Sequence, residues 1–596
     1  MTLKVSKKFM ILKWFGIATL FSALLLAGIT WYLSVKLKPI LTAEIKELVL
    51  ESTDSLYRIE FSSIRTNVLT GISALEDVKI SPDTTIYHKL IALKKAPNNL
   101  YKIKLKKLAV RNFHPFRMWR HKKLNIDLLL FDNPCVVMTN RQFDFNEDKP
   151  PFPKQSPYDY ISRYLKELRI KTIEFKNASF KYIDNNASKP EIDSVANLNV
   201  TLKDWLIDPT SADDKSRLYL LKDVVINLNN YRFATPDSLY DLNLNQLDFS
   251  ASSGKLNIKS FNLTPRYEEM KFADTAGYAK DRYNIQMSNI NLSGINLPLY
   301  ILKQELFAKE MNIANGTLSV SSNNAFPKKV EEKTGQYPHQ LLQKLNAQLH
   351  IEKLNLTNVD ISYAEFNPNS GQKGIITFEQ TSGSVSNVTN VEKAKAKNPL
   401  MVAGLTSNMM GAGKLDVNFK FNLAAKDGSF SYSGSLGKMD GKVLNRITKP
   451  LGMVRVNSGD IRKLEFNIEA NDELAKGQVN FAYNDLSVAL LKRVKGEDRL
   501  VKKGLMSFLA NALIINSDNP NAAGVFITAP VNRKRVKTAS FFNFIWKTLF
   551  EGVKYSVGLT PEKEQKVKDQ IAKFEKMKTD REERIKRRAE RSKRKK

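Results

Sequence analysis

The sequence of 596 residues has few of the side chains that enzymes and metalloproteins use. Cysteine occurs once, at Cys135, which excludes an intrachain disulfide and a cysteine metal cluster. The five histidines are scattered, and His114 and His121, which lie among lysines, suit a basic surface better than a metal site. GAGKLD at 411–416 lacks the glycine spacing of a phosphate-binding loop and continues into a strand pattern. We therefore expect no catalytic residue, no metal and no cofactor.

An uncharged hydrophobic run occupies positions 14–33. A helix of about twenty residues spans a hydrocarbon core of roughly 30 Å, and Trp14, Trp31 and Tyr32 lie at the two ends, where aromatic rings prefer the membrane interface. A cleaved signal peptide would end in small residues, whereas bulky residues end this segment. We predict a single-pass signal anchor in a bacterial inner membrane, with residues 1–13 in the cytoplasm and the bulk of the chain in the periplasm.

Acidic residues are fewer than basic ones, 61 against 93, and the formal net charge is +32. Nucleic acid would suit this charge, but the predicted anchor places the chain in the wrong compartment, so we expect no nucleic-acid partner. Lys102, Lys104 and Lys106 alternate with apolar residues, which predicts a strand with one basic face. Two interpretations of that face remain open: contact with anionic headgroups of the membrane, and an ordinary solvated surface.

From Tyr57 to about Tyr483, polar and apolar residues alternate in runs separated by Asn, Gly, Asp, Ser and Pro. Short helices are predicted at about 158–167, 296–307, 338–347 and 498–513. We predict a mainly β fold: an N-terminal transmembrane helix, then an elongated, curved and repetitive β-sheet groove with short helices, then C-terminal helices. The predicted segments are a cytoplasmic N-terminus (1–13), the anchor (14–33), a helical linker (34–56), two groove segments (57–300 and 301–495), a helix with a closing strand (496–539), an amphipathic helix (540–559) and a charged helix with a basic tail (560–596).

One strand pattern is present twice, as LRIKTIEFKNASFKYID at 168–184 and LHIEKLNLTNVDISYAE at 349–365. A helical pattern precedes both copies, beginning at Pro157 and Pro338. The coinciding pairs are Leu168 with Leu349, Ile170 with Ile351, Ile173 with Leu354, Phe175 with Leu356, Asn177 with Asn358, Phe180 with Ile361 and Tyr182 with Tyr363. With one residue of slippage, the match extends to Leu129, Phe131, Asn133, Val136 and Met138 in one copy and Met311, Ile313, Asn315, Leu318 and Val320 in the other. Chance repetition of strand patterning is the alternative to a duplication or a repeating architecture, which we favour.

Within the repeated strands, a three-residue step between apolar residues is followed by alternation up to an asparagine, as in Ile170, Ile173, Phe175 and Asn177. The step interrupts strict alternation, so we predict a bulge there that bends the strand and keeps the apolar side chains on one face. Asparagine tolerates left-handed backbone angles, so each Asn is predicted at a turn or a strand corner.

A curved sheet with one apolar face has to cover that face. Two arrangements fit the periodicity equally: a closed sandwich or barrel core, and an open trough whose apolar interior meets another molecule. The residues that would line the trough are Ile170, Ile173, Phe175, Phe180, Ile351, Leu354, Leu356 and Ile361.

The chain resembles AsmA-like proteins of Gram-negative bacteria in two places. The first is the order of anchor, helix and then the strands of YRIEFSSIRTNVLTGISALEDVKISPD (57–83). The second is the strand, Gly-bearing turn, strand and short helix within 411–472. The resemblance covers most of residues 10–490. It implies a periplasmic β-groove related to those of TamB and YhdP and, more distantly, of bridge-like lipid transfer proteins. The implied partners are phospholipids or other membrane lipids, moved between the inner and outer membranes or used in outer-membrane assembly. The alternative is a membrane-anchored scaffold that binds proteins during envelope biogenesis, with a closed β-core and no lipid transport.

The amphipathic helix 540–559 has a broad apolar side. The residues of this side that would contact a membrane interface are Phe541, Phe542, Ile545, Trp546, Leu549 and Phe550. Capping of the groove and packing on the β-body are the two other positions open to this helix. The basic tail suits an anionic lipid surface or an acidic partner, so the outer membrane or an envelope protein is the expected partner of the C-terminus.

Overall fold

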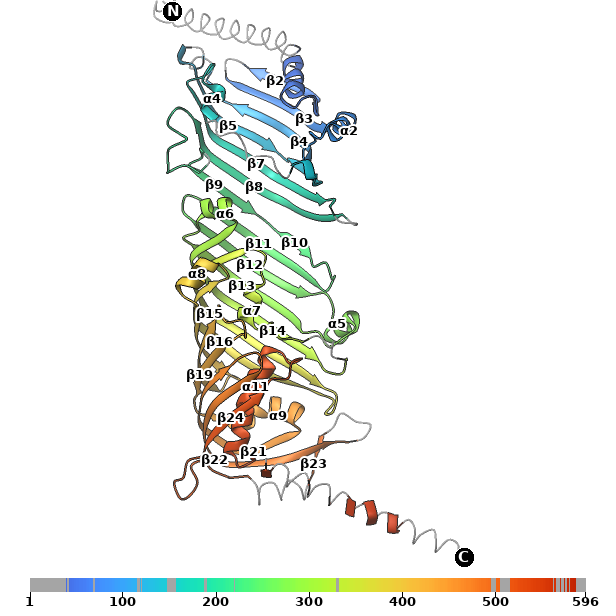
Figure 1. The fold of residues 1–596 in the computed structure, drawn as a ribbon, viewed down its shortest axis with the longest axis vertical. Coiled ribbons are helices and arrows are strands. Elements are labelled where there is room, and N and C mark those ends of the chain that lie inside the picture. The colour runs from blue at the N-terminus through green and yellow to red at the C-terminus, as the bar shows by residue number, and fades with distance from the viewer. Residues whose placement is uncertain are drawn as a thin grey trace, which may run out of the picture. The chain divides into compact units, whose positions relative to one another are not determined.

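The computed structural model describes residues 42–67, 70–114, 120–146, 157–186, 190–218, 220–327, 332–494, 500–503 and 515–560, with single positions at 39, 118 and between 562 and 585. Within these residues, 24 strands form a mixed sheet, which confirms the predicted mainly β fold (Figure 1). The chain divides into a first unit, Met1–Tyr231 with Asn245–Leu256, and a second unit, Arg232–Leu244 with Asn257–Lys596. The predicted anchor at 14–33 lies outside the described residues.

The first unit consists of a short N-terminal helix at 42–52 followed by strands and small helices. Its strands are β1 (Tyr57–Glu60), β2 (Ser63–Asn67), β3 (Ile72–Pro82), β4 (Asn99–Arg111), β5 (Lys123–Asp132), β6 (Cys135–Asn140), β7 (Glu167–Asp184), β8 (Glu191–Ile207) and β9 (Asp223–Leu228). Its other helices are α2 (Thr84–Ala92), η1 (Asp144–Asn146) and α4 (Pro157–Ile161). All the described pairs are antiparallel except β5–β7 and β6–β7, which are parallel.

The second unit contains the longest strands and most of the helices. Three strands have residues in both units: β10 (Tyr231–Ala234), β11 (Tyr240–Ser250) and β12 (Lys255–Pro265). The remaining strands are β13 (Arg282–Ser293), β14 (Glu305–Asn323), β15 (Gln348–Asn367), β16 (Gln372–Thr389), β17 (Leu400–Met409), β18 (Gly413–Asn422), β19 (Phe430–Leu436), β20 (Met439–Asp440), β21 (Val454–Ala470), β22 (Leu474–Arg493), β23 (Leu500–Lys502) and β24 (Thr528–Lys534). The helices are α5 (Glu269–Ala276), α6 (Leu297–Lys303), α7 (Pro338–Gln343), α8 (Glu392–Lys397), η2 (Gly441–Leu444), α9 (Asn445–Gly452) and α11 (Phe541–Ser556).

The strand pairing confirms the repeat seen in the sequence. The parallel partner of β7 is β5 followed by β6, and the parallel partner of β15 is β14. The matched residues pair in the same way: Leu129 with Ile173, Phe131 with Phe175, Val136 with Phe180 and Met138 with Tyr182 in one unit; Met311 with Leu354, Ile313 with Leu356, Leu318 with Ile361 and Val320 with Tyr363 in the other. A parallel pair needs a crossover connection, and the segments that contain α4 and α7 make it.

The repeated asparagines adopt the predicted left-handed backbone. The φ angles are +50° at Asn133, +51° at Asn177, +65° at Asn315 and +56° at Asn358. The bulge, in contrast, is not where the three-residue step predicted it. The register of β7 with β8 is constant from Ile170 to Phe175 and shifts on both sides of Ala178, next to Asn177, and β15 shifts at the equivalent place.

Within the step itself, the compensation comes from the neighbouring strand. Lys171, the exposed residue that follows Ile170, lies opposite Asp204, and Glu352 in the second copy lies opposite Asn387. Both opposing residues have a positive φ, +54° and +59°. A left-handed residue in the partner strand therefore accompanies the break in alternation, and Ile170 and Ile173 are both buried.

The predicted short helices are present but end earlier than expected, because the chain enters a strand. The helix predicted at 158–167 is α4, and β7 already begins at Glu167. The helices predicted at 296–307 and 338–347 are α6 and α7. The first described residues of the segment predicted as a helix at 498–513 form β23, and residues 504–513 lie outside the described part of the chain.

The main hydrophobic core lies in the C-terminal part of the second unit. Among its fully buried members are Tyr432, Ile468, Val479 and Tyr483. Helix α11 packs on β22 and β24 over this core (Figure 1). A Cβ added to Gly552 would lie 2.5 Å from Val479 Cγ2, so the glycine lets the helix lie directly on the sheet.

Candidate functional site

Apolar side chains of neighbouring strands lie opposite one another and form rows across the sheet of each unit. We call the longest one the Leu354 row; its members are Leu292, Met311, Leu354, Val385, Ala403, Phe419, Tyr432, Ile468, Gly477 and Val531. A similar row in the first unit contains Leu75, Leu108, Phe131, Phe175, Val200 and Ile226. Each row presents a continuous apolar strip to one side of its sheet.

Of the trough residues predicted in the first unit, Phe175 belongs to the row of that unit. Ile170 and Ile173 are buried, 5% and 9% exposed, whereas Phe175 and Phe180 are partly exposed. The ring of Phe175 stacks on that of Phe131 with centroids 4.6 Å apart. The predicted residues are therefore neighbours on one face, and the face is exposed in part.

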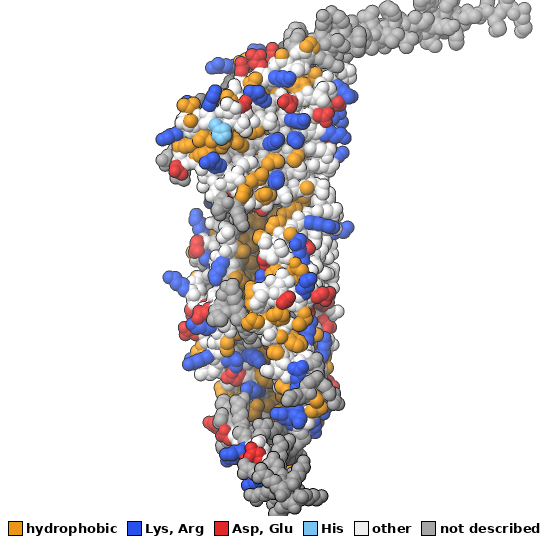
Figure 2. Space-filling view, turned by 90° about the vertical axis from the view of Figure 1, so that its right-hand side faces the viewer, with side chains coloured by type: hydrophobic (Ala, Val, Ile, Leu, Met, Phe, Trp, Pro, Cys, Tyr) orange, Lys and Arg blue, Asp and Glu red, His pale blue; other side chains and the backbone are white. Residues whose placement is uncertain are grey.

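The trough residues predicted in the second unit show the same pattern. Ile351 is buried at 5% exposure, and Leu354, Leu356 and Ile361 are partly exposed. Figure 2 shows a face with a hollow in which hydrophobic side chains gather. Within the described residues, the apolar face around Met311, Leu354 and Leu356 is therefore open in part.

Helices cover one region of the apolar face in each unit. In the first unit, Ile45 and Val49 of the N-terminal helix pack against a cluster of Ile59, Ile64, Leu75, Val78 and Leu105. In the second unit, α11 packs on β22 and β24 and α9 packs on β15, β16 and β21, and Tyr432 and Ile468 of the main core are 1% and 0% exposed. The helices thus cover part of the apolar face, and Met311 and Leu354 stay partly exposed.

Helix α11 places most of the membrane-interface candidates against the C-terminal core. Phe541 lies among the rings of Tyr337, Phe419, Phe421 and Phe430, at centroid distances between 5.4 and 6.3 Å. Ile545, Trp546 and Leu549 also pack against this core. The candidates with other neighbours are Phe542, which is 40% exposed and stacks on Tyr363 at 6.1 Å, and Phe550, which stacks on Trp546 at 5.3 Å.

The basic strand has the alternation predicted from its sequence. Lys102, Lys104 and Lys106 of β4 are exposed, and Leu105 between them is buried. Lys104 lies opposite Lys79 of β3, which is also exposed. Among the described residues, none of these four lysines has a carboxylate within ion-pair distance, so the face is available to an anionic surface.

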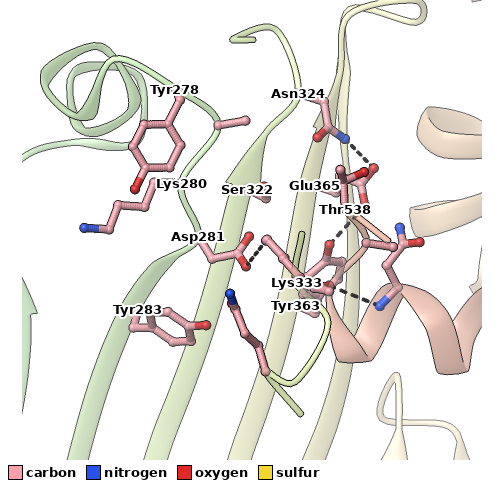
Figure 3. A pocket seen from close by; sticks show the side chains of 15 residues that line it. Tyr278, Lys280, Asp281, Tyr283, Ser322, Asn324, Lys333, Tyr363, Glu365 and Thr538 are labelled. Atoms are coloured by element: carbon pink, nitrogen blue, oxygen red, sulfur yellow. Dashed lines mark hydrogen bonds and ion pairs between the residues drawn. The ribbon is translucent and has the colours of Figure 1, made fainter. Parts of the chain in front are cut away.

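A pocket of about 230 Å³ opens beside the partly exposed part of the second unit (Figure 3). Along one face of β15, the apolar Ile361 is followed by Tyr363 and then by Glu365, and the last two line the pocket. Lys333 and Asp281 form an ion pair at 3.2 Å within the lining. Thr538, Ser540 and Asn543, from the start of α11 and the residues before it, close the pocket. The lining is therefore mostly polar, and the apolar Ile361 precedes it along β15.

Lys280 of the lining forms an ion pair with Asp237, which lies outside the lining. Burial opposes the charge of Lys280, but the hydrogen bond and charge of Asp237, 2.9 Å away, outweigh it and raise the lysine pKa. Hydrogen bonds from Thr235 and Lys280 lower the pKa of Asp237 to about 2. Burial raises the pKa of Tyr283 to about 12 and raises that of Tyr363 further, helped by the charge of Glu365. The tyrosines are therefore neutral hydrogen-bond donors at physiological pH.

A buried arginine fixes the segment that forms one wall of the pocket. The side chain of Arg535 is 1% exposed, pairs with Asp472 and donates to the carbonyl oxygen of Lys333. Its guanidinium lies 4.2 Å from the ring centroid of Tyr337. Asp472 also accepts from Gln340 Nε2 at 2.7 Å. The turn between β21 and β22, the end of β24 and the start of α7 are tied together by this one pair.

Sequence reasoning did not find the pocket or the buried pair. Asp281, Lys333, Glu365 and Ser540 come from four separate segments, and none stands in a recognisable motif. The one usable signal was the change along the second strand copy from Ile361 through Tyr363 to Glu365.

No group of three His, Cys, Asp or Glu residues within the described ranges is arranged to hold a metal ion. No helix among the same residues is long and apolar enough to cross a membrane. No protein-family model matches this chain, and no curated protein matches it either.

Proposed function

We propose that the open apolar face is a lipid-binding groove and that the protein is an AsmA-like lipid carrier. In this proposal, residues 14–33 anchor the chain in a bacterial inner membrane and the β-body lies in the periplasm. The groove carries phospholipids between the inner and outer membranes or supplies them to outer-membrane assembly. The observation that supports the proposal best is that the Leu354 row has partly exposed members in β14, β15 and β16, between buried members in β13 and β17.

The energetics of lipid transfer favour such an arrangement. Each methylene taken out of water contributes about 0.8 kcal/mol, so a lipid with roughly thirty methylenes costs on the order of 20 kcal/mol to expose. An apolar strip that continues from strand to strand offsets this cost along its length. A face that stays open on one side leaves the headgroup in water, where its charges remain hydrated.

The basic face of β4 supports a position next to a membrane. Lys102, Lys104 and Lys106 are exposed and lack carboxylate partners among the described residues, so they are free to meet anionic headgroups, each contributing about 1 kcal/mol near the surface. In the proposed arrangement, this face lies close to the inner membrane, because it follows the anchor in the sequence.

The test is to purify the full chain in mild detergent and to measure bound lipid by native mass spectrometry. Leu354→Asp and Leu356→Asp should abolish lipid binding while the circular dichroism spectrum is unchanged. Thr357→Asp is the matched control, because Thr357 is the exposed neighbour of Leu356 in β15 and should leave lipid binding as in the wild type. A folded wild-type protein without lipid would contradict the proposal and favour the protein-binding scaffold.

A further inference from the structure

The pocket beside the open face contains a carboxylate that the described residues do not neutralise. Glu365 accepts hydrogen bonds from Tyr363 Oη at 3.0 Å and from Asn324 Nδ2. Both donors are uncharged, and among the described residues no lysine, arginine or histidine lies within ion-pair distance of Glu365. The remaining charge of this partly buried group is available to a cation supplied by a ligand.

The surroundings of Glu365 favour an ammonium group over a metal ion. The rings of Tyr278, Tyr283 and Tyr363 line the same pocket. Aromatic faces attract an ammonium group by about 0.5–2 kcal/mol. Metal binding would require further carboxylate or imidazole ligands, and no such cluster is present in the described part of the chain.

The lining also contains two lysines, Lys280 and Lys333. Lys333 is 32% exposed and pairs with Asp281, which is 17% exposed, so the ion pair faces the pocket and remains accessible. A phosphate can share these lysines with their carboxylate partners, since an ammonium donates more than one hydrogen bond. The lining therefore offers a site for each sign of charge.

The size of the pocket limits the ligand to a small group. A volume of 230 Å³ corresponds to about eight positions the size of a water molecule. A phosphate joined to a two-carbon amine has a similar number of non-hydrogen atoms, whereas an acyl chain would fill a longer, apolar space. The acyl chains of such a ligand have the adjoining face at Ile361 and Leu318, which lie opposite each other in β15 and β14.

From this geometry we propose that the pocket binds the headgroup of an amine-bearing phospholipid, with the ammonium at Glu365 and the tyrosines and the phosphate at Lys333. The inference rests on the proposed lipid-carrying function and adds a headgroup preference to it. The groove selects for acyl chains by burial alone, and the pocket adds selection by charge.

The experiment uses the full chain incubated with vesicles of equimolar phosphatidylethanolamine and phosphatidylglycerol, followed by mass spectrometry of the bound lipid. Wild type should be enriched in phosphatidylethanolamine. Glu365→Gln should lower the ratio of the two bound lipids by at least about tenfold, the equivalent of one lost charge-assisted hydrogen bond. Lys537→Gln is the control, because the ion pair of Lys537 with Glu332 is exposed at 65% and 59% and lies outside the lining.

A second arm separates the pocket from the groove. Soluble O-phosphoethanolamine, without acyl chains, should bind Leu356→Asp as it binds wild type, and Glu365→Gln should not bind it. If lipid binds but the ratio of bound phosphatidylethanolamine to phosphatidylglycerol is the same in Glu365→Gln and wild type, the proposed headgroup site is wrong. The proposed lipid-binding groove is then still supported. If wild type binds no vesicle lipid, the proposed function is wrong. If wild type also fails to bind O-phosphoethanolamine, the proposed headgroup site is wrong as well.

Discussion

The second unit contains two regions built from the same rows of apolar residues, and the two differ in what covers them. At β14–β16, Met311, Leu354 and Val385 are partly exposed. Further along the same row, at β19 and β21, Tyr432 and Ile468 are 1% and 0% exposed. Strand pattern and register are alike in both regions. Helix α11 packs on β22 and β24 and therefore distinguishes the packed core from the partly exposed strands, whereas α9 packs on strands of both regions, β15, β16 and β21.

This difference has a functional consequence. A closed core is fixed by packing, and an added side chain or ligand has no room in it. An open apolar face has a free-energy cost in water, which a bound acyl chain removes. A chain that needed only stability would cover the face throughout, so the open region is the part that we associate with lipid binding.

The largest expected effect compares a charge placed in each region. Ile468→Asp buries a carboxylate in the packed core and should cost more than about 4 kcal/mol, enough to unfold the second unit. Leu356→Asp places the same carboxylate on the open face, where water reaches it, and should cost about 1 kcal/mol. Urea unfolding followed by tryptophan fluorescence measures both. Similar losses for the two variants would show that the face around Leu356 is as closed as the core.

The buried ion pair at the edge of the covered region gives the next effect. Arg535→Ala leaves Asp472 buried without its cation and should destabilise the second unit by about 3–5 kcal/mol. Lys537 lies two residues after Arg535 and forms an exposed ion pair with Glu332. Lys537→Ala should therefore change the free energy of unfolding by less than about 0.5 kcal/mol. Thermal unfolding of the two variants distinguishes these roles, and a mild effect of Arg535→Ala would mean that the pair does not hold the cover in place.

A buried histidine makes the covered region sensitive to pH. His339 is 1% exposed among Tyr337, Phe421 and Phe430, and burial lowers its pKa from 6.5 to about 4, although the charge of Asp472 acts in the opposite direction. Between pH 6.5 and 4 the unfolded chain binds a proton at this residue and the folded chain does not, so stability falls as the pH is lowered.

The loss at His339 should total on the order of 3 kcal/mol by pH 4, with no further change below it. His339→Phe removes the titration and keeps an aromatic ring in the cluster, so its stability should depend less on pH over this range. Chemical denaturation at pH 7, 5.5 and 4 provides the comparison. Parallel pH profiles for wild type and variant would show that His339 is protonated in the folded protein.

The features predictable from the sequence were those that a local pattern determines. The repeat was visible because Ile173 and Leu354 follow the same spacing, and the left-handed Asn177 and Asn358 followed from the chemistry of asparagine. Helix α11 was predicted from its apolar side, but an apolar side has the same pattern whether it meets a membrane or a sheet. Its position on β22 and β24 required the tertiary structure.

Other features depend on contacts between distant segments. The parallel pairing of β14 with β15 was not predicted, since parallel and antiparallel strands show the same period of two. Helix α5 was missed because it has only eight residues and buries only Phe272 and Ala273. The pocket joins Asp281, Lys333 and Glu365 across gaps of tens of residues, and the sequence carries no record of that distance in space.

The smallest expected effect tests whether the two copies of the repeat use asparagine for the same reason. The backbone N–H of each asparagine donates to a side chain of the next strand, Asn177 to Asn199 at 2.9 Å and Asn358 to Ser382 at 3.0 Å, and their φ angles agree. Asn358 also donates from Nδ2 to Asn315 at 2.7 Å. Alanine removes the amide and resists the left-handed backbone, and glycine removes the amide alone. In each copy, the alanine variant should therefore be less stable than the glycine variant by about 1 kcal/mol.

The absolute losses of stability should differ between the copies, because Asn358→Gly also removes the hydrogen bond to Asn315. Asn358→Gly should therefore lose about 1 kcal/mol more stability than Asn177→Gly. Unfolding midpoints of the four single variants give both quantities. Equal stability of the alanine and glycine variants would mean that the backbone at these positions relaxes and that side-chain contacts alone keep the asparagines in place. A constant difference with unequal absolute losses would show that the duplicated strands share the left-handed corner, while each region has fitted its own contacts around it.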